Sequence, residues 1–113
     1  MQYALLIYGR AEEDRAARPI AGALAALLDG PNVTAWARLH ADGSATTLRH
    51  EDGRTLLTDG PFIDSKEYLG GVILIEAENL DGALAIAEDM LEQTRPGTAI
   101  EVRPILVGRF RDA

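Results

Sequence analysis

The side chains best suited to chemistry lie in one polar segment, residues 57–71, between two apolar stretches. The segment contains Asp59, Lys66 and Glu67, whose side chains can exchange protons or bind a polar ligand. Hairpin connections are usually about 2–5 residues long, and longer connections rich in charge often carry function. We therefore expect a candidate site in this segment, although its residue types do not specify a reaction.

Asp59 opens the Asp-Gly-Pro-Phe sequence at residues 59–62 and has two explanations. As a turn residue, it would accept backbone N–H groups through its carboxylate, as aspartate often does. As a site residue, it would act as a general base or bind a cationic or hydroxylated ligand. The two roles are compatible, and Asp59 is the best catalytic candidate. Phe62 is expected to pack in the core or to form a pocket wall.

Two candidates lie outside this segment. Arg49 ends the Ala-Thr-Thr-Leu-Arg stretch and can either hold an anionic group by a bidentate contact or pair with Asp59 or Glu67. Tyr8 ends the first apolar stretch, where it would line a cleft or cap the core.

Asp64, Lys66 and Glu67 form a mixed-charge cluster, which is either part of a site or a solvated loop. The glycines at 70–71 indicate the close approach of another backbone or a ligand, or else a bulge. The candidate ligand-binding residues are therefore Tyr8, Arg49, Asp59, Phe62, Lys66 and Glu67.

The composition argues against several classes of site. The chain has no cysteine, which excludes disulfides, thiolate metal sites and a cysteine nucleophile. His40 and His50 lack the paired spacing of metal ligands, so we expect no metal and no cofactor. With a net charge of −7 and no basic patch, the chain is a poor nucleic-acid binder. A few of its scattered arginines can still converge on a small anionic ligand.

The hydropathy pattern gives no sign of membrane insertion or export. No apolar stretch approaches the ~20 residues that span a bilayer. No basic region precedes the apolar start of the chain, and no small-residue cleavage site follows it. We therefore expect a cytoplasmic protein.

Apolar periodicity predicts the secondary structure. Residues 2–8 and 72–75 are continuous apolar stretches, typical of strands buried on both faces. Further strands are expected at residues 33–40, 45–50, 55–57 and about 99–107, with an Asp-Gly hairpin turn at residues 52–53. A helix is predicted from Pro19, in its first turn, to Leu28, and a second helix after an Asn79 cap.

This order of elements predicts one α+β domain over residues 1–113, with two helices against one antiparallel sheet. Two helices can cover one face of that sheet, yet the strands at 2–8 and 72–75 are apolar on both faces. A second copy of the same sheet is the simplest way to cover the remaining apolar face. We therefore predict a homodimer packed sheet to sheet with two-fold symmetry.

Residues 59–62, followed by Ser-Lys-Glu at 65–67 and Leu-Gly-Gly at 69–71, resemble the DGPF proteins of the YCII-related family. The resemblance extends over nearly the whole chain through residues 1–8, 45–49, 80–84 and 101–104. It implies a ferredoxin-like two-layer sandwich that dimerises into an α/β barrel. The family is largely uncharacterised; some relatives are thought to accompany extracytoplasmic-function sigma factors, and some carry a proposed His–Asp pair in a cleft.

The chain departs from these relatives in two respects. His40 and His50 match no motif of the proposed His–Asp pair. The segment before Trp36 is short, so we expect a truncated first helix.

Two functions remain open from the sequence. The first is binding of a small polar molecule in a cleft beside residues 59–62, with or without catalysis. The alternative is a non-catalytic accessory or regulatory protein of a sigma-factor system, which would bind a protein partner through its acidic surface.

Overall fold

The computed structural model describes residues 1–10, 19–63 and 66–110. In chain order its elements are β1 (Gln2–Gly9), α1 (Gly22–Leu28), β2 (Val33–Arg38), the short 3-10 helix η2 (Asp42–Ser44), β3 (Thr46–Glu51), β4 (Arg54–Asp59), β5 (Tyr68–Glu76), α2 (Leu80–Glu92) and β6 (Ala99–Pro104).

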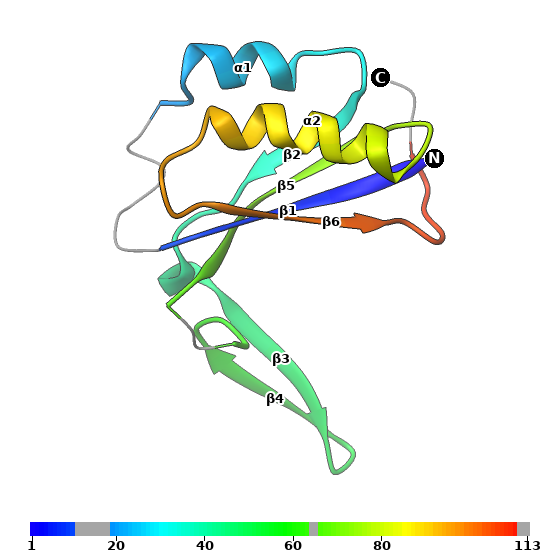
Figure 1. The fold of residues 1–113 in the computed structure, drawn as a ribbon. Helices are drawn as coiled ribbons and strands as arrows, with labels where there is room; N and C mark the ends of the chain where they lie inside the picture. Colours follow the sequence, from blue (N-terminus) through cyan, green and yellow to red (C-terminus); the bar gives the residue numbers. More distant parts are fainter. Residues whose placement is uncertain (11–18, 64–65, 111–113) are drawn as a thin grey trace.

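Four strands form the main sheet in the order β2-β5-β1-β6, and each neighbouring pair is antiparallel. Both helices lie over one face of this sheet (Figure 1). The predicted α+β class is confirmed, and the arrangement is compatible with a ferredoxin-like sandwich. None of the described helices is long and apolar enough to cross a membrane.

The core lies between the helices and alternate residues of the two central strands. Leu5 of β1 is the cross-strand partner of Ile73 in β5, and Tyr3 is that of Ile75. All four side chains are buried, together with Met90 of α2. Because successive strand residues point to opposite faces, these partners define the face that the helices cover.

The other face of the sheet is covered by no described helix. Its apolar side chains come from the alternate positions of β1, β5 and β2, and we call them the open face: Ala4, Leu6, Val72, Leu74, Ala35 and Ala37. The members on β1 and β5 are half-buried, and the two alanines of β2 are exposed. Burial of the central strands on both faces, which the sequence predicts, is therefore incomplete within one chain.

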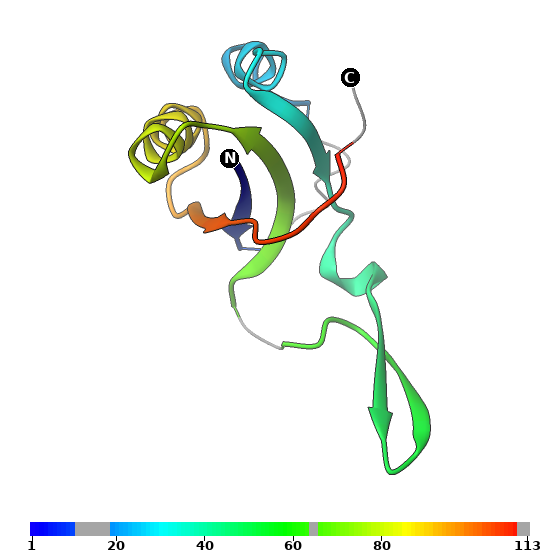
Figure 2. The ribbon, with the colours of Figure 1, turned by 90° about the vertical axis from the view of Figure 1, so that its right-hand side faces the viewer.

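Strands β3 and β4 pair with each other to form a separate two-stranded sheet, which we call the arm (Thr46–Asp59). At its tip, Asp52 and Gly53 have φ values of 50° and 76°, as a type I′ turn requires. This confirms the predicted Asp-Gly turn. The arm projects from the main sheet on the side away from the helices (Figures 1 and 2).

The separate arm corrects the expectation of one continuous sheet. Strand β2 pairs with β5 rather than with β3, and η2 redirects the chain between them. The radius of gyration is 15.6 Å, against about 13 Å for a compact domain of this length. The arm therefore makes the chain more extended than a typical domain of its size.

The helix boundaries differ partly from the predicted ones. Helix α1 begins at Gly22, after an Ala21 cap that has no side-chain hydrogen bond, so Pro19 precedes the helix instead of opening it. At seven residues, α1 is short, as predicted. The Asn79 cap of α2 is confirmed, since its side chain accepts a 2.9 Å hydrogen bond from the Gly82 N–H.

Most strand boundaries differ from the predicted ones by a few residues. Strand β2 ends at Arg38 and β6 at Pro104, each earlier than expected, whereas β4 and β5 are longer. Residues 12–14, a charged run before the predicted helix that we expect to be a solvated lead-in or a frayed first turn, lie outside the described residues.

Candidate functional site

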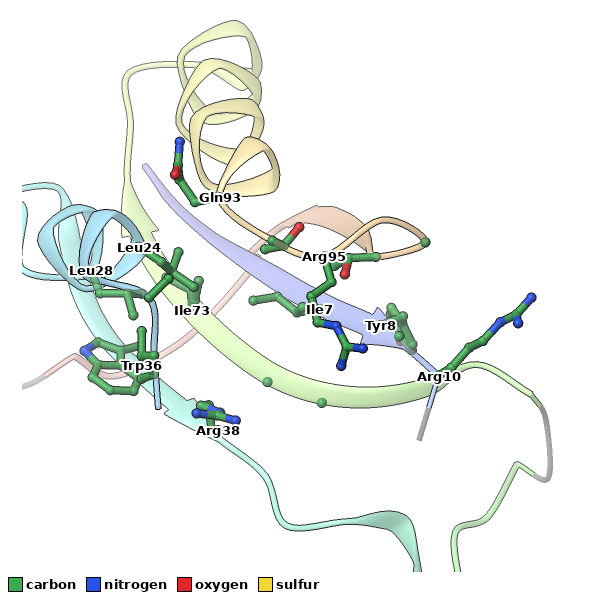
Figure 3. Close-up of a pocket in the computed structure, with 18 of the residues that line it drawn as sticks. Ile7, Tyr8, Arg10, Leu24, Leu28, Trp36, Arg38, Ile73, Gln93 and Arg95 are labelled. Atoms are coloured by element: carbon green, nitrogen blue, oxygen red, sulfur yellow. The ribbon is translucent and has the colours of Figure 1, made fainter. Parts of the chain in front are cut away.

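A cavity of about 700 Å³ lies between α1, the segment that follows α2 and one end of the main sheet (Figure 3). Its lining comes from the end of β1 (residues 7–10), from α1 and the residues before it, from the end of β2, from the start of β5 and from the loop at residues 93–98. Small-molecule sites usually have volumes of about 300–1,000 Å³. The cavity is therefore large enough for a small organic ligand.

One end of the cavity is apolar. Trp36 of β2 is the cross-strand partner of Ile73 in β5, so both side chains point toward the helices. Leu24 and Leu28 of α1 lie beside them (Figure 3). Trp36 remains 46% exposed, which leaves its ring available to a flat apolar group.

Three arginines from separate segments line the cavity: Arg38 lies beside Trp36, Arg95 extends over the sheet, and the Arg10 side chain points away from both (Figure 3). Arg38 ends β2, Arg95 lies in the loop after α2, and Arg10 follows β1 (Figure 3). Glu67 is the one carboxylate among the described lining residues, so this lining is formally cationic. The chain as a whole carries a net charge of −7, so the sign of this lining is opposite to that of the whole chain.

Gly71 sets the distance between two strands at the cavity wall. A Cβ atom at this position would lie 3.1 Å from the backbone oxygen of Ala37 and 3.8 Å from Ile7 Cδ1. Both structural explanations of the glycine pair are confirmed: another backbone approaches closely at Gly71, and a bulge lies at Gly70, where the β1–β5 register shifts between Ile7–Gly71 and Tyr8–Leu69. The missing side chain also leaves space in the cavity, of which Gly71 is a lining residue.

The candidate residues from the sequence fall into two groups. Tyr8 and Glu67 line the cavity. The other four are not among its lining residues and lie on the arm or in the segment after it: Arg49, Asp59, Phe62 and Lys66. A single chain therefore does not bring the six candidates to one described cleft.

Arg49 and Phe62 have surroundings different from those expected. Arg49 Nη2 lies 3.2 Å from Glu51 Oε2, so its partner is a neighbour on the same strand rather than Asp59 or Glu67. Phe62 is 69% exposed, so the expected core position is wrong for the single chain. The reason is that residues 61–63 run outside the main sheet and its helices. Asp64 lies outside the described residues.

The turn at residues 59–62 is held through Gly60. The Gly60 N–H donates to the Ala45 oxygen at 2.8 Å, and Thr47 Oγ1 donates to the Gly60 oxygen at 2.8 Å. The Asp59 side chain is exposed, and no hydrogen bond between described residues uses its carboxylate. These bonds give the turn a structural basis that does not depend on the Asp59 side chain.

Comparison with known proteins is consistent with this fold. Residues 1–107 match the YCII-related domain. The chain belongs to the YCII-related family. It is 36% identical to an uncharacterized protein of Rhizobium meliloti (strain 1021) over 115 residues, which cover 93% of this chain and 92% of that protein. The resemblance inferred from residues 59–71 is thus confirmed.

In this YCII-related protein, sequence reasoning missed Trp36, Arg38 and Arg95 as members of one site. Trp36 and Arg38 lie two residues apart on β2, whereas Arg95 is distant in the chain and joins them because the loop after α2 lies at the same end of the sheet. The scattered arginines gave a signal only in the general form that some of them can converge on an anion. Within residues 1–10, 19–63 and 66–110, no group of three or more histidine, aspartate or glutamate side chains is arranged to hold a metal ion.

Proposed function

We propose that this YCII-related protein binds a small molecule that carries an anionic group beside an apolar part. The observation that carries the proposal is that Arg38 and Arg95, from separate segments, line the same cavity as Trp36, with Arg10 at its edge. A guanidinium presents a planar fork of donors that matches a carboxylate or a phosphate. The apolar end would accept the rest of the ligand and exclude water from it.

The electrostatic balance of the chain supports this choice of ligand. A net charge of −7 repels anions from most of the surface, so a cationic cavity would concentrate them locally. Arginine stems also cover apolar surface for purely structural reasons. If the arginines bind an anion, the negative charge of a ligand strengthens its binding. If they only cover apolar surface, the charge of the ligand has no effect on its affinity.

Tyr8 and Glu67 are the lining side chains that can exchange a proton with a bound ligand. A reaction in this cavity would draw on them. Asp59 and Lys66 are not lining residues in one chain, so a role for them in binding would require a second copy. Replacing Asp59 by Asn and Lys66 by Ala tests that role, because weaker binding with an unchanged fold would assign them to the site.

We also propose that the protein is a homodimer packed through the open face. Its accessible surface is 8212 Å², whereas a compact monomer of 12.2 kDa exposes about 6,100 Å². The excess, roughly 2,000 Å² per chain, is within the range that obligate dimers bury. Packing two half-buried open faces against each other would give a dimeric α/β barrel.

Paired ligands test the proposed function. Benzoate and indole-3-acetate are compared with their neutral amides, benzamide and indole-3-acetamide, by isothermal titration calorimetry at millimolar concentrations. We expect at least one acid to bind about tenfold or more tightly than its amide, since the charged contact is lost in the amide. Equal binding of each pair, or no binding by either acid, would contradict the proposal.

A further inference from the structure

The arm has two chemically different faces. Cross-strand partners share a face, so Leu48 lies beside Leu57, with His50 and Thr55 toward the tip. Both leucines are about two-thirds exposed, at 66% and 67%. We call this the leucine face.

The opposite face of the arm is charged. It carries Arg49, paired with Glu51 at 3.2 Å, and also Arg54. Leu56 lies on this side and is less exposed, at 36%. A charged face of this kind suits solvent, whereas the leucine face has no cover among the described residues of its own chain.

A hairpin of two strands is marginally stable in water unless it packs against something. Backbone hydrogen bonds nevertheless close the chain on both sides of the junction, one at the end of the β2–β5 pair and one at the base of the arm itself. The Leu39 N–H donates to the Gly70 oxygen at 2.9 Å, and the Gly60 N–H donates to the Ala45 oxygen at 2.8 Å. A hairpin closed at its base, with an exposed apolar face, is suited to docking on another body.

The direction of the arm indicates where that body lies. Figures 1 and 2 show the arm projecting on the side of the sheet opposite the helices, which is the side of the open face. A body that covers the open face therefore also lies next to the arm. The roughly 2,000 Å² of excess surface per chain is an area that a second copy can bury.

We propose that the leucine face of the arm packs against a second copy of this chain, so that two arms grip the dimer reciprocally. This inference rests on the proposed homodimer and adds a second contact to it, separate from the open face. Because of the two-fold symmetry, each arm contacts the other copy in the same way, so both leucine faces are covered. The segment with Asp59 and Phe62, at the base of the arm, then borders the interface.

Matched variants test the arm. Leu48→Ser with Leu57→Ser removes the leucine face, and Leu56→Ser makes the same change on the charged face. Sedimentation velocity across a concentration series gives the dimer dissociation constant, and circular dichroism verifies folding. We expect the double variant to raise this constant at least about tenfold per leucine, and the Leu56 variant to change it less than about threefold.

The experiment distinguishes failure of the arm contact from failure of the dimer as a whole. A dimer equally tight in the double variant would overturn the arm contact and leave the open-face dimer standing. A monomeric wild-type protein at ten micromolar would overturn the arm contact and the dimer together. Neither result bears on ligand binding, which the calorimetric comparison of acids and amides measures separately.

A second measurement covers the case in which the double variant fails to fold. The chain has no cysteine, so Leu57→Cys and Leu56→Cys each give one site for a nitroxide spin label. We expect an immobilised label at position 57 and a mobile one at position 56 in the electron paramagnetic resonance spectrum. Equal mobility at the two positions would overturn the proposal.

Discussion

Arg38 and Glu67 stand at the two points where the chain leaves the main sheet for the arm and returns to it. Arg38 is the last residue of β2, Glu67 directly precedes β5, and both line the cavity. The chain therefore leaves the cavity wall for the arm at Arg38 and returns to the cavity wall at Glu67. Next to these residues, the backbone hydrogen bond from the Leu39 N–H to the Gly70 oxygen closes the stretch of chain that contains the arm.

The first prediction follows from this junction. A ligand that contacts Arg38 and Glu67 should reduce the opening of the adjacent Leu39–Gly70 hydrogen bond, since binding stabilises the closed state. We expect saturating benzoate to slow amide hydrogen exchange at Leu39, as followed by NMR. The amide of Gly53, at the arm tip, serves as the internal control and should be unaffected. Unchanged exchange at Leu39 under saturation would contradict a ligand held at this end of the cavity.

A second prediction separates the side chains around the turn at residues 59–62. Thr47→Val removes the 2.8 Å bond to the Gly60 oxygen, a loss of about 0.5–1.5 kcal/mol in local stability. Amide exchange at Gly60 should accelerate by a corresponding factor of roughly two to ten. Asp59→Asn should leave this exchange unchanged, because the described bonds do not use its carboxylate. Faster exchange at Gly60 in the Asp59 variant would show that the Asp59 carboxylate helps to fix the turn.

The third prediction concerns Gly71. A valine at this position would press against the Ala37 backbone oxygen, which lies 3.1 Å from the Cβ position, and would fill part of the cavity. We expect Gly71→Val to lower the free energy of unfolding by about 1–3 kcal/mol in urea, as overpacking does. Gly9→Val is the control, since nothing lies within 4 Å of its Cβ position. An unfolding free energy equal to that of the control would mean that β2 and β5 can separate without cost.

The fourth prediction concerns the different starts of the two helices. Asn79→Ala removes the cap of α2 and should cost about 1 kcal/mol, with recovery in Asn79→Asp. Helix α1 lacks a side-chain cap at Ala21, so Ala21→Ser should stabilise the protein by about 0.5–1 kcal/mol. Thermal and urea unfolding measure both changes. Loss of stability in the Ala21 variant would show that this position has no room for a cap beside the cavity.

The features that the sequence predicted correctly are mostly local. Asn79 caps its own helix, and the turn at Asp52 depends on two adjacent residues. The separation of the arm from the main sheet was not predicted, because it depends on β2 pairing with β5 rather than with its neighbour in sequence. Alternation of apolar residues gives each strand its faces but does not identify its partner.

The site was harder to predict for the same reason. The charged segment at residues 59–67 is conspicuous in the sequence, but within one chain it contributes Glu67 to the cavity and leaves Asp59 exposed. Arg38 and Arg95 have unremarkable sequence surroundings and become neighbours of one cavity through the antiparallel sheet order. Such convergence depends on contacts between distant segments, which spacing alone does not encode.

The most direct test of the central claim is a titration with benzoate followed through Trp36, the single tryptophan of the chain and a lining residue of the cavity. We expect a saturable change in fluorescence, with a dissociation constant about tenfold or more higher in Arg95→Gln, since a charged hydrogen bond is lost. Arg54→Gln, the same change on the arm, should bind as tightly as the wild type. An unresponsive Trp36, or equal affinities in the two variants, would contradict an anion site in this cavity.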